Sequence, residues 1–305
     1  MDVAAHIGEL RRNGELLAAA VDADGLDRPI PCCPGWQVRD LLQHIGMVHR
    51  WAAANVKSGA MATRGTRGTG APMTDDEMRH AVGPFPADAL LTGWFREGHA
   101  ALVETLMSAD PAVQCWTFMA APTPLAFWAR RQAHETAIHR VDAESVGQAI
   151  TPVSAEFAAD GIDELLTGFA PRARRRLRAD PPRTLAVHAT DVSAAAEGAD
   201  WVVRVGPEGA KTARRAERAG QEHERAGQEH ERAGQEHERA GQEHERAGRD
   251  PRGGQDSAAD CVITGAAADL YLLLWNRCAG QAGIDVAGDP SVLTLLREKL
   301  QVRWS

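Results

Sequence analysis

RRQAHETAIHRVDAE, residues 130–144, places a carboxylate and an imidazole, Glu135 and His139, four residues apart in a stretch that we predict to be one helix. Side chains at i and i+4 share a face of a helix. A divalent metal ion needs ligands that converge on one point, so this pair supplies two ligands if a neighbouring helix supplies a third. His134 lies five residues before His139, roughly 140° around the helix, so we do not expect it to bind the same ion.

The same stretch also has a simpler interpretation. Glu135 and His139, with the flanking Arg130, Arg131 and Arg140, could form a charged, solvated helix face stabilised by i,i+4 pairs, which is a common arrangement. The helix by itself does not decide between a metal site and such a face.

The third ligand is sought upstream, in CCPGWQVRDLLQHIGMVHRW, residues 32–51, which offers His44 and His49. The apolar stripe of this helix places both histidines near its borders, and its members are Leu41, Leu42, Ile45 and Val48. Periodicity therefore leaves both histidines open.

Helical periodicity defines the first half of the chain. Apolar residues recur at helical spacing in four long stretches, at about 3–21, 36–57, 86–108 and 123–146. Four amphipathic helices of this length predict a four-helix bundle. We expect this bundle to form a metal-binding domain at 1–150.

The pattern changes after Gly147. A helix at about 154–169 is followed by short runs rich in β-branched residues and then by a further helix at 269–277. The three runs that we predict to be strands are 185–191, 201–206 and 261–265. The fold class is therefore mainly α, with a smaller α+β domain at 151–305.

A low-complexity insertion at about 213–256 interrupts this second domain. The heptad GQEHERA occurs four times in tandem over 220–247, so that its histidines are seven residues apart. On a helix that spacing is about 10.5 Å along the axis, too far for ligands of one zinc ion. Because alanine is the only apolar side chain of the heptad, we predict a solvated insertion that does not join the core.

Composition excludes several classes of protein. The net charge of −8 argues against a nucleic-acid surface, and no apolar run approaches the ~18 residues of a membrane span. No secretion signal opens the sequence, and the five cysteines show no C-x-x-C spacing. We expect a cytoplasmic protein without a disulfide framework, a membrane or a nucleic-acid partner, and leave its oligomeric state open.

Five segments together carry a resemblance to a known family. They are PCCPGWQVRDLLQHIGMVHRW, RRQAHETAIHRVDAE, AADGIDELLTGF, LAVHATD and CVITGAAADLYLLLWNR. The chain resembles the maleylpyruvate isomerase family of mycothiol-dependent enzymes from actinobacteria over nearly its whole length, except for the insertion. The resemblance implies a DinB-like four-helix bundle that carries a metal ion, followed by a sterol-carrier-like α+β domain.

The resemblance also implies a site and a reaction. The family's histidine in the D-L-L-x-H stretch matches His44, and its helix-four ligands match Glu135 and His139. Two histidines and one glutamate leave an open position on zinc, where mycothiol would bind as a thiolate. The thiolate would add to the cis double bond of maleylpyruvate, and rotation and elimination would give fumarylpyruvate. Arg277 is the implied catalytic partner of this dicarboxylate substrate, with Arg131 and Arg140 as weaker choices.

Two further functions remain possible. The chain could attach the same thiol to an electrophile, as an S-transferase. It could also be a non-catalytic module that keeps the metal as a staple of the bundle and binds a small ligand or a protein. A purely structural zinc usually has four protein ligands, so the three residues favour an enzyme.

Overall fold

A computed structural model describes residues 1–59, 82–147, 149–192, 200–214, 259–277 and 283–302. The GQEHERA repeats lie outside the described residues, so their predicted solvation is a matter for experiment. No helix in the described part of the chain is long and apolar enough to cross a membrane.

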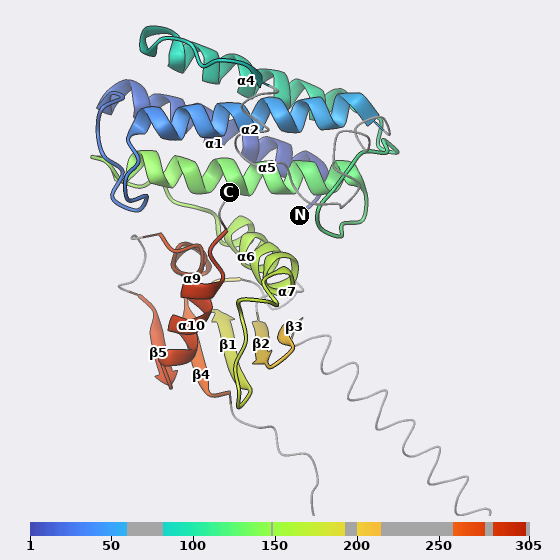
Figure 1. The fold of residues 1–305 in the computed structure, drawn as a ribbon, viewed down its shortest axis with the longest axis vertical. Coiled ribbons are helices and arrows are strands. Elements are labelled where there is room, and N and C mark those ends of the chain that lie inside the picture. The colour runs from blue at the N-terminus through green and yellow to red at the C-terminus, as the bar shows by residue number, and fades with distance from the viewer. Residues whose placement is uncertain (60–81, 148, 193–199, 215–258, 278–282, 303–305) are drawn as a thin grey trace, which may run out of the picture.

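Four long helices form a bundle (Figure 1). They are α1 (Val3–Asp24), α2 (Val38–Ser58), α4 (Asp88–Ser108) and α5 (Pro124–Glu144). Helix α1 packs on α5 and α4, and α2 packs on α4 and α5. The four predicted helices are confirmed, with ends that differ by only a few residues.

Local signals in the sequence set the starts of α2 and α5. The backbone N–H of Gln37 donates to Asp40 Oδ2 at 2.8 Å, which closes a capping box before α2. Thr123 caps α5 by accepting from the N–H of Ala126 at 3.1 Å, and Pro124 occupies the first turn. These starts fix the positions of the ligand candidates along the two helices.

The α+β part begins with a continuous helical segment and ends on a sheet. The segment comprises α6 (Ala155–Asp163), the π-helical turn η2 (Glu164–Phe169) and α7 (Ala170–Arg172). The other elements are β1 (Arg183–Ala189), β2 (Asp200–Gly206), β3 (Gly209–Arg214), β4 (Cys261–Gly265), α9 (Ala267–Leu274), β5 (Asp285–Gly288) and α10 (Ser291–Lys299). The predicted fold class, a bundle followed by a smaller α+β part, is confirmed.

The sheet has the order β3-β2-β1-β4-β5, with β1 and β4 parallel and the other pairs antiparallel. Strands β3 and β5 and helix α10 were not predicted. Ala213 and Arg214 pair with Val202 and Trp201 at the end of β3. The first two residues of the predicted insertion therefore belong to the sheet.

Helix α5 lies between the two parts of the molecule. Its Trp128, Ala133 and Ala137 belong to a core cluster of the bundle, whereas Ile138 and Val141 belong to the cluster that includes the sheet. Almost every residue of α5 is buried, charged ones included. The metal-site candidates on α5 are therefore in the interior.

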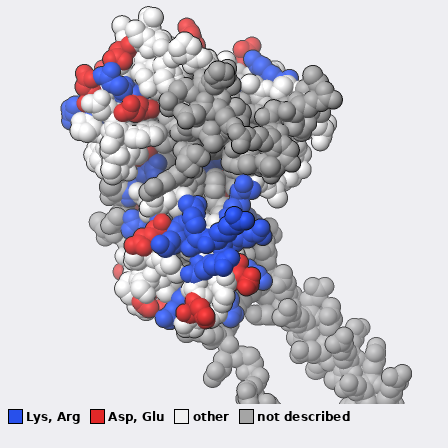
Figure 2. Space-filling view, in the orientation of Figure 1, with Lys and Arg blue, Asp and Glu red and all other residues white. Residues whose placement is uncertain are grey.

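Charge is unevenly distributed over the surface. Figure 2 shows Lys and Arg side chains gathered on the face below the bundle, where α7 and the chain after it lie. The run RARRRLR at 172–178 contributes five exposed arginines. Because the net charge averages over this basic region, the absence of a nucleic-acid partner stays a prediction.

Candidate metal centre

His44, Glu135 and His139 come together between α2 and α5. Each offers a ligand atom, and these atoms all lie within 4.8 Å of one another. All three residues are buried. His49 instead contacts Thr136 Oγ1 at 2.8 Å and packs on Phe95. The structure thus separates the two histidines that periodicity left open and brings His44 to the pair on α5.

The distances fit an ion better than hydrogen bonds. Glu135 Oε1 lies 3.5 Å from His44 Nε2 and 3.4 Å from His139 Nε2. Hydrogen bonds from nitrogen to oxygen usually span 2.7–3.2 Å. Two ligands about 2.1 Å from a tetrahedral zinc ion are about 3.4 Å apart. The donor set, two imidazoles and one carboxylate, therefore suits a zinc ion in chemistry and in spacing.

Hydrogen bonds and charges around the cluster hold Glu135 in its charged form. Burial alone would raise the pKa of Glu135, but contacts with His139 and His44 and the charge of Arg131 hold that pKa well below its ordinary value. His139 Nδ1 donates to Asp142 Oδ2 at 2.9 Å, which leaves Nε2 facing Glu135. Glu135 is thus a carboxylate, and His139 presents a ring nitrogen to it.

Arg277 reaches the cluster through Asp142. Its Nε lies 2.7 Å from Asp142 Oδ1, and its Nη2 donates to Oδ2 at 2.8 Å. Burial alone would lower the pKa of Arg277, but the charge of Asp142 raises it. The side chain keeps 16% exposure.

The other two predicted substrate arginines are placed differently. Arg131 is fully buried between Glu135 and Glu164, and Arg140 is fully buried against Glu144 and Asn13. Neither side chain reaches solvent, so neither is available to a substrate. Their burial also rules out the alternative of a solvated charged face on α5.

A tight loop before α2 covers the cluster, and the sequence did not indicate this. The ring of Trp36 lies 5.3 Å from that of His44 and 6.5 Å from that of His139. Gly35, at a φ of 87°, provides the left-handed turn that brings Trp36 into this position.

Cys33, from the same loop, also lies at the cluster. Burial, followed by the charge of Asp142, raises the pKa of its thiol to about 12. The thiol contacts Asp142 and is near Arg277. Asp142 follows His139 by three residues on the same helix face, so its place beside the cluster could be read from the sequence. The places of Trp36 and Cys33 could not.

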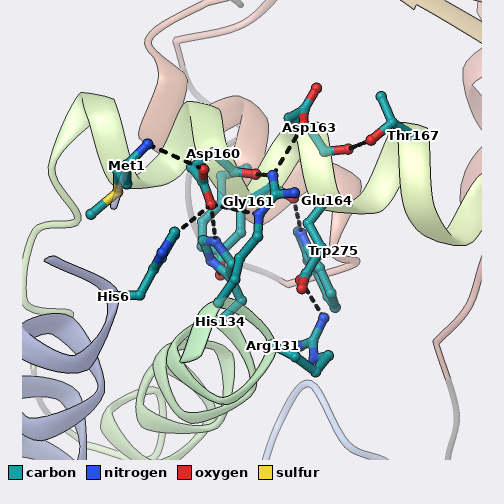
Figure 3. A network of polar contacts seen from close by, with 12 residues as sticks. Met1, His6, Arg131, His134, Asp160, Gly161, Asp163, Glu164, Thr167 and Trp275 are labelled. Atoms are coloured by element: carbon teal, nitrogen blue, oxygen red, sulfur yellow. Dashed lines mark hydrogen bonds and ion pairs between the residues drawn. The ribbon is translucent and has the colours of Figure 1, made fainter. Parts of the chain in front are cut away.

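A second cluster of possible ligands, His6, His134 and Asp160, is a hydrogen-bond network (Figure 3). Asp160 Oδ2 lies 3.0 Å from His6 Nε2 and 2.8 Å from His134 Nε2, and it also accepts from Arg130 at 2.8 Å. These are hydrogen-bond distances, and a guanidinium on the same oxygen opposes a cation there. His134 thus faces away from the metal candidates, as predicted.

Comparisons with known proteins agree with this geometry. Residues 7–144 match the family model "Mycothiol maleylpyruvate isomerase N-terminal domain". Two solved structures share the fold: one described as a mycothiol-dependent maleylpyruvate isomerase (13% identity, TM-score 0.52) and one as its histidine-to-alanine mutant (12% identity, TM-score 0.52). Each match covers 94% of this chain and 93% of the other.

No curated protein matches the chain significantly. At 13% identity the structural likeness shows the fold, and the family model shows the membership of the bundle. The matched residues contain the whole cluster of His44, Glu135 and His139. The helical part of this chain therefore belongs to the family of mycothiol maleylpyruvate isomerase N-terminal domains.

Proposed function

We propose that His44, Glu135 and His139 bind a divalent metal ion, zinc before others, and that the chain is a mycothiol-dependent enzyme. The observation that carries this proposal is the spacing of the three ligand atoms. They are buried, converge on one point, and stand 3.4 and 3.5 Å apart where hydrogen bonds would be shorter. When bound there, zinc supplies an open position at which a thiol is held as thiolate near neutral pH.

The side chains around the site have separate tasks. Asp142 holds the Nδ1 proton of His139, and Arg131 holds Glu135 Oε2 at 3.0 Å, so that Oε1 faces the two imidazoles. Arg277 uses one edge of its guanidinium on Asp142 and donates from Nη1 to the carbonyl of Trp275. The remaining N–H groups are available for a substrate carboxylate.

The reaction that we propose is the cis–trans isomerisation of maleylpyruvate to fumarylpyruvate. Support comes from the family model over the bundle and from the shared fold of the solved isomerase. Transfer of the thiol to an electrophile would use the same site. We propose 1–150 as the metal-binding domain and 151–305, with its insertion, as a sterol-carrier-like domain that supplies Arg277.

The test is an isomerisation assay with purified full-length protein loaded with zinc. Maleylpyruvate and mycothiol are added, and the trans product is followed by nuclear magnetic resonance. We expect turnover that requires both metal and thiol, and loss of turnover in His44→Ala and Arg277→Ala. His188→Ala, which alters a half-exposed histidine on β1, serves as the control and should retain turnover.

Two other outcomes would redirect the proposal. Consumption of a thiol-reactive electrophile without isomerisation would identify an S-transferase. A zinc-loaded protein that shows no turnover and no sulfur-to-metal charge-transfer band with mycothiol after cobalt substitution would support the non-catalytic binding module.

A further inference from the structure

Both metal candidates on α5 have a second contact that ends in the α+β part of the molecule. Each contact passes through one charged side chain on α5 to a residue beyond position 160. These two chains of contacts are Glu135–Arg131–Glu164 and His139–Asp142–Arg277.

The first chain crosses from α5 to η2. Arg131 donates from Nη2 to Glu135 Oε2 at 3.0 Å and from Nη1 to Glu164 Oε2. Its guanidinium also lies 5.2 Å from the ring centre of Phe169 and 5.1 Å from that of Trp275. Figure 3 shows Arg131 reaching from α5 towards Glu164 and Trp275. Residues of the α+β part therefore fix the arginine that orients Glu135.

The second chain crosses from α5 to the end of α9. Asp142 is fully buried and binds His139 Nδ1 on one side and the guanidinium of Arg277 on the other. Asn276, at a φ of 61°, ends α9, and the N–H of Arg277 returns to the carbonyl of Leu272 at 2.8 Å. This Schellman turn aims Arg277 at Asp142.

His44 on α2 provides an internal contrast. Its Nδ1 is buried and has no hydrogen-bond partner among the described residues. The support is thus specific to the two candidates on α5, the helix that lies between the two parts.

We infer that Glu164 and Arg277 are positioning residues of the metal site, so that the α+β part sets the metal affinity of the bundle. This rests on the metal site of the proposed function. Residues that orient metal ligands change metal affinity about 10–100-fold when removed. The bundle alone would therefore be an incomplete metal site, although it contains all three ligands.

The experiment measures the zinc dissociation constant of the full-length chain by competition with a chromophoric chelator. The variants are Asp142→Asn, Arg277→Met and Glu164→Gln, of which the first and last keep the shape of the side chain. We expect each to bind zinc about 10–100-fold more weakly than the parent protein. Visible spectra of the cobalt-substituted proteins should show altered ligand geometry.

Arg214→Met is the matched control. Arg214, on β3, pairs with Asp163, which directly precedes Glu164 in the chain, but Arg214 contacts no ligand candidate. It should lower the melting temperature without changing zinc affinity. Double variants test the connections. Asp142→Asn with Arg277→Met should be no weaker than Asp142→Asn alone, whereas Glu164→Gln with Arg277→Met should multiply the separate effects.

Zinc affinities within twofold of the parent in both Glu164→Gln and Arg277→Met would overturn the inference. So would a loss of affinity in Arg214→Met equal to theirs, since that would reflect general destabilisation. The proposed function fails separately: a parent protein that binds no zinc removes the site itself, and one that binds zinc without turnover removes only the reaction.

Discussion

Glu135 illustrates how a single residue acquires its role from its neighbours. A buried carboxylate would ordinarily hold its proton, because burial raises its pKa. Here two imidazoles and Arg131 reverse this effect and keep the pKa low. The charge is therefore ready before any cation arrives, and the cation replaces weak, long contacts with direct bonds.

His44→Ala and His139→Ala should each weaken zinc binding by more than about tenfold, since even a change behind the ligands costs 10–100-fold. Elemental analysis after dialysis against a weak chelator measures the retained metal. His188→Ala on β1 is the control and should keep its zinc. Full metal content in both ligand variants would place the site elsewhere.

The sequence specified this site only in part. The i,i+4 spacing predicted Glu135 and His139, whereas periodicity left His44 and His49 open and only the family resemblance implied His44. The resemblance implied Arg277 as a substrate partner. Its contact with Asp142 could not be predicted, because the two residues are 135 positions apart in the sequence. Trp36 and Cys33 could not be predicted at the site, because nothing in the sequence of their loop shows that it closes over the cluster.

At the scale of elements, the close approach of α6 to α5 and α9 depends on Gly161. A Cβ atom there would lie 2.3 Å from Tyr271 Cε2 and 2.8 Å from His134 Nδ1. Both neighbours are buried rings that cannot move aside freely. The missing side chain thus sets how near the two parts of the molecule can pack.

Gly161→Ala should therefore destabilise the protein by about 1–3 kcal/mol, the usual cost of overpacking a core. Gly8→Ala is the matched control, because a Cβ at Gly8 in α1 meets nothing within 4 Å. That change should instead stabilise the protein by roughly 0.5–1 kcal/mol. Chemical denaturation of both variants measures the two effects, and equal melting curves would contradict the packing argument.

Elements with strong periodicity were predicted, and edge elements were not. Strand β5 is exposed along its whole length, and β3 carries Lys211 and Arg214, so neither shows the alternation of a half-buried strand. Helix α10 had a readable signal in Val292, Leu293 and Leu296, which are buried on one face. The charged residues of α5 suggested a solvated face, because charged side chains are seldom buried. In the structure they are paired with one another and with the α+β part, and almost all of α5 is buried.

At the scale of the whole molecule, stability should depend on pH through buried histidines. Burial lowers the pKa of His49, His99 and His134, so the native state leaves them neutral. In the unfolded chain they take up protons near pH 6.5. Each such group lowers the free energy of unfolding by up to about 1.4 kcal/mol per pH unit below that point.

His139 has the opposite sign, because Asp142 and Glu135 raise its pKa against the effect of burial. Its contribution is full below pH 6.5 and is lost as pH rises through the raised pKa. Three groups outweigh one, so the metal-free protein should become less stable from pH 7.5 to 5.5. Urea unfolding at three pH values tests this, and a free energy that rises towards pH 5.5 would contradict it.

The insertion can be removed if the linker that replaces it spans the distance from the end of β3 to the start of β4. Strands β3 and β4 both run parallel to β1, and β2 and β1 lie between them. A connection from the end of β3 to the start of β4 must therefore cross three strand spacings, about 14 Å, and return along a strand, about 17 Å. The direct span is roughly 22 Å, so a linker of only a few residues would not reach.

Replacing 215–258 by a Gly/Ser linker of about 15 residues, whose mean reach is about 21 Å, should leave the melting temperature and the zinc content unchanged. The replacement keeps Ala213 and Arg214, which pair with β2. A four-residue linker reaches at most about 14 Å and should strain or unpair β3, with a clear drop in melting temperature. If the long linker causes the same drop, the insertion contributes to the folded core and the prediction from its composition is wrong.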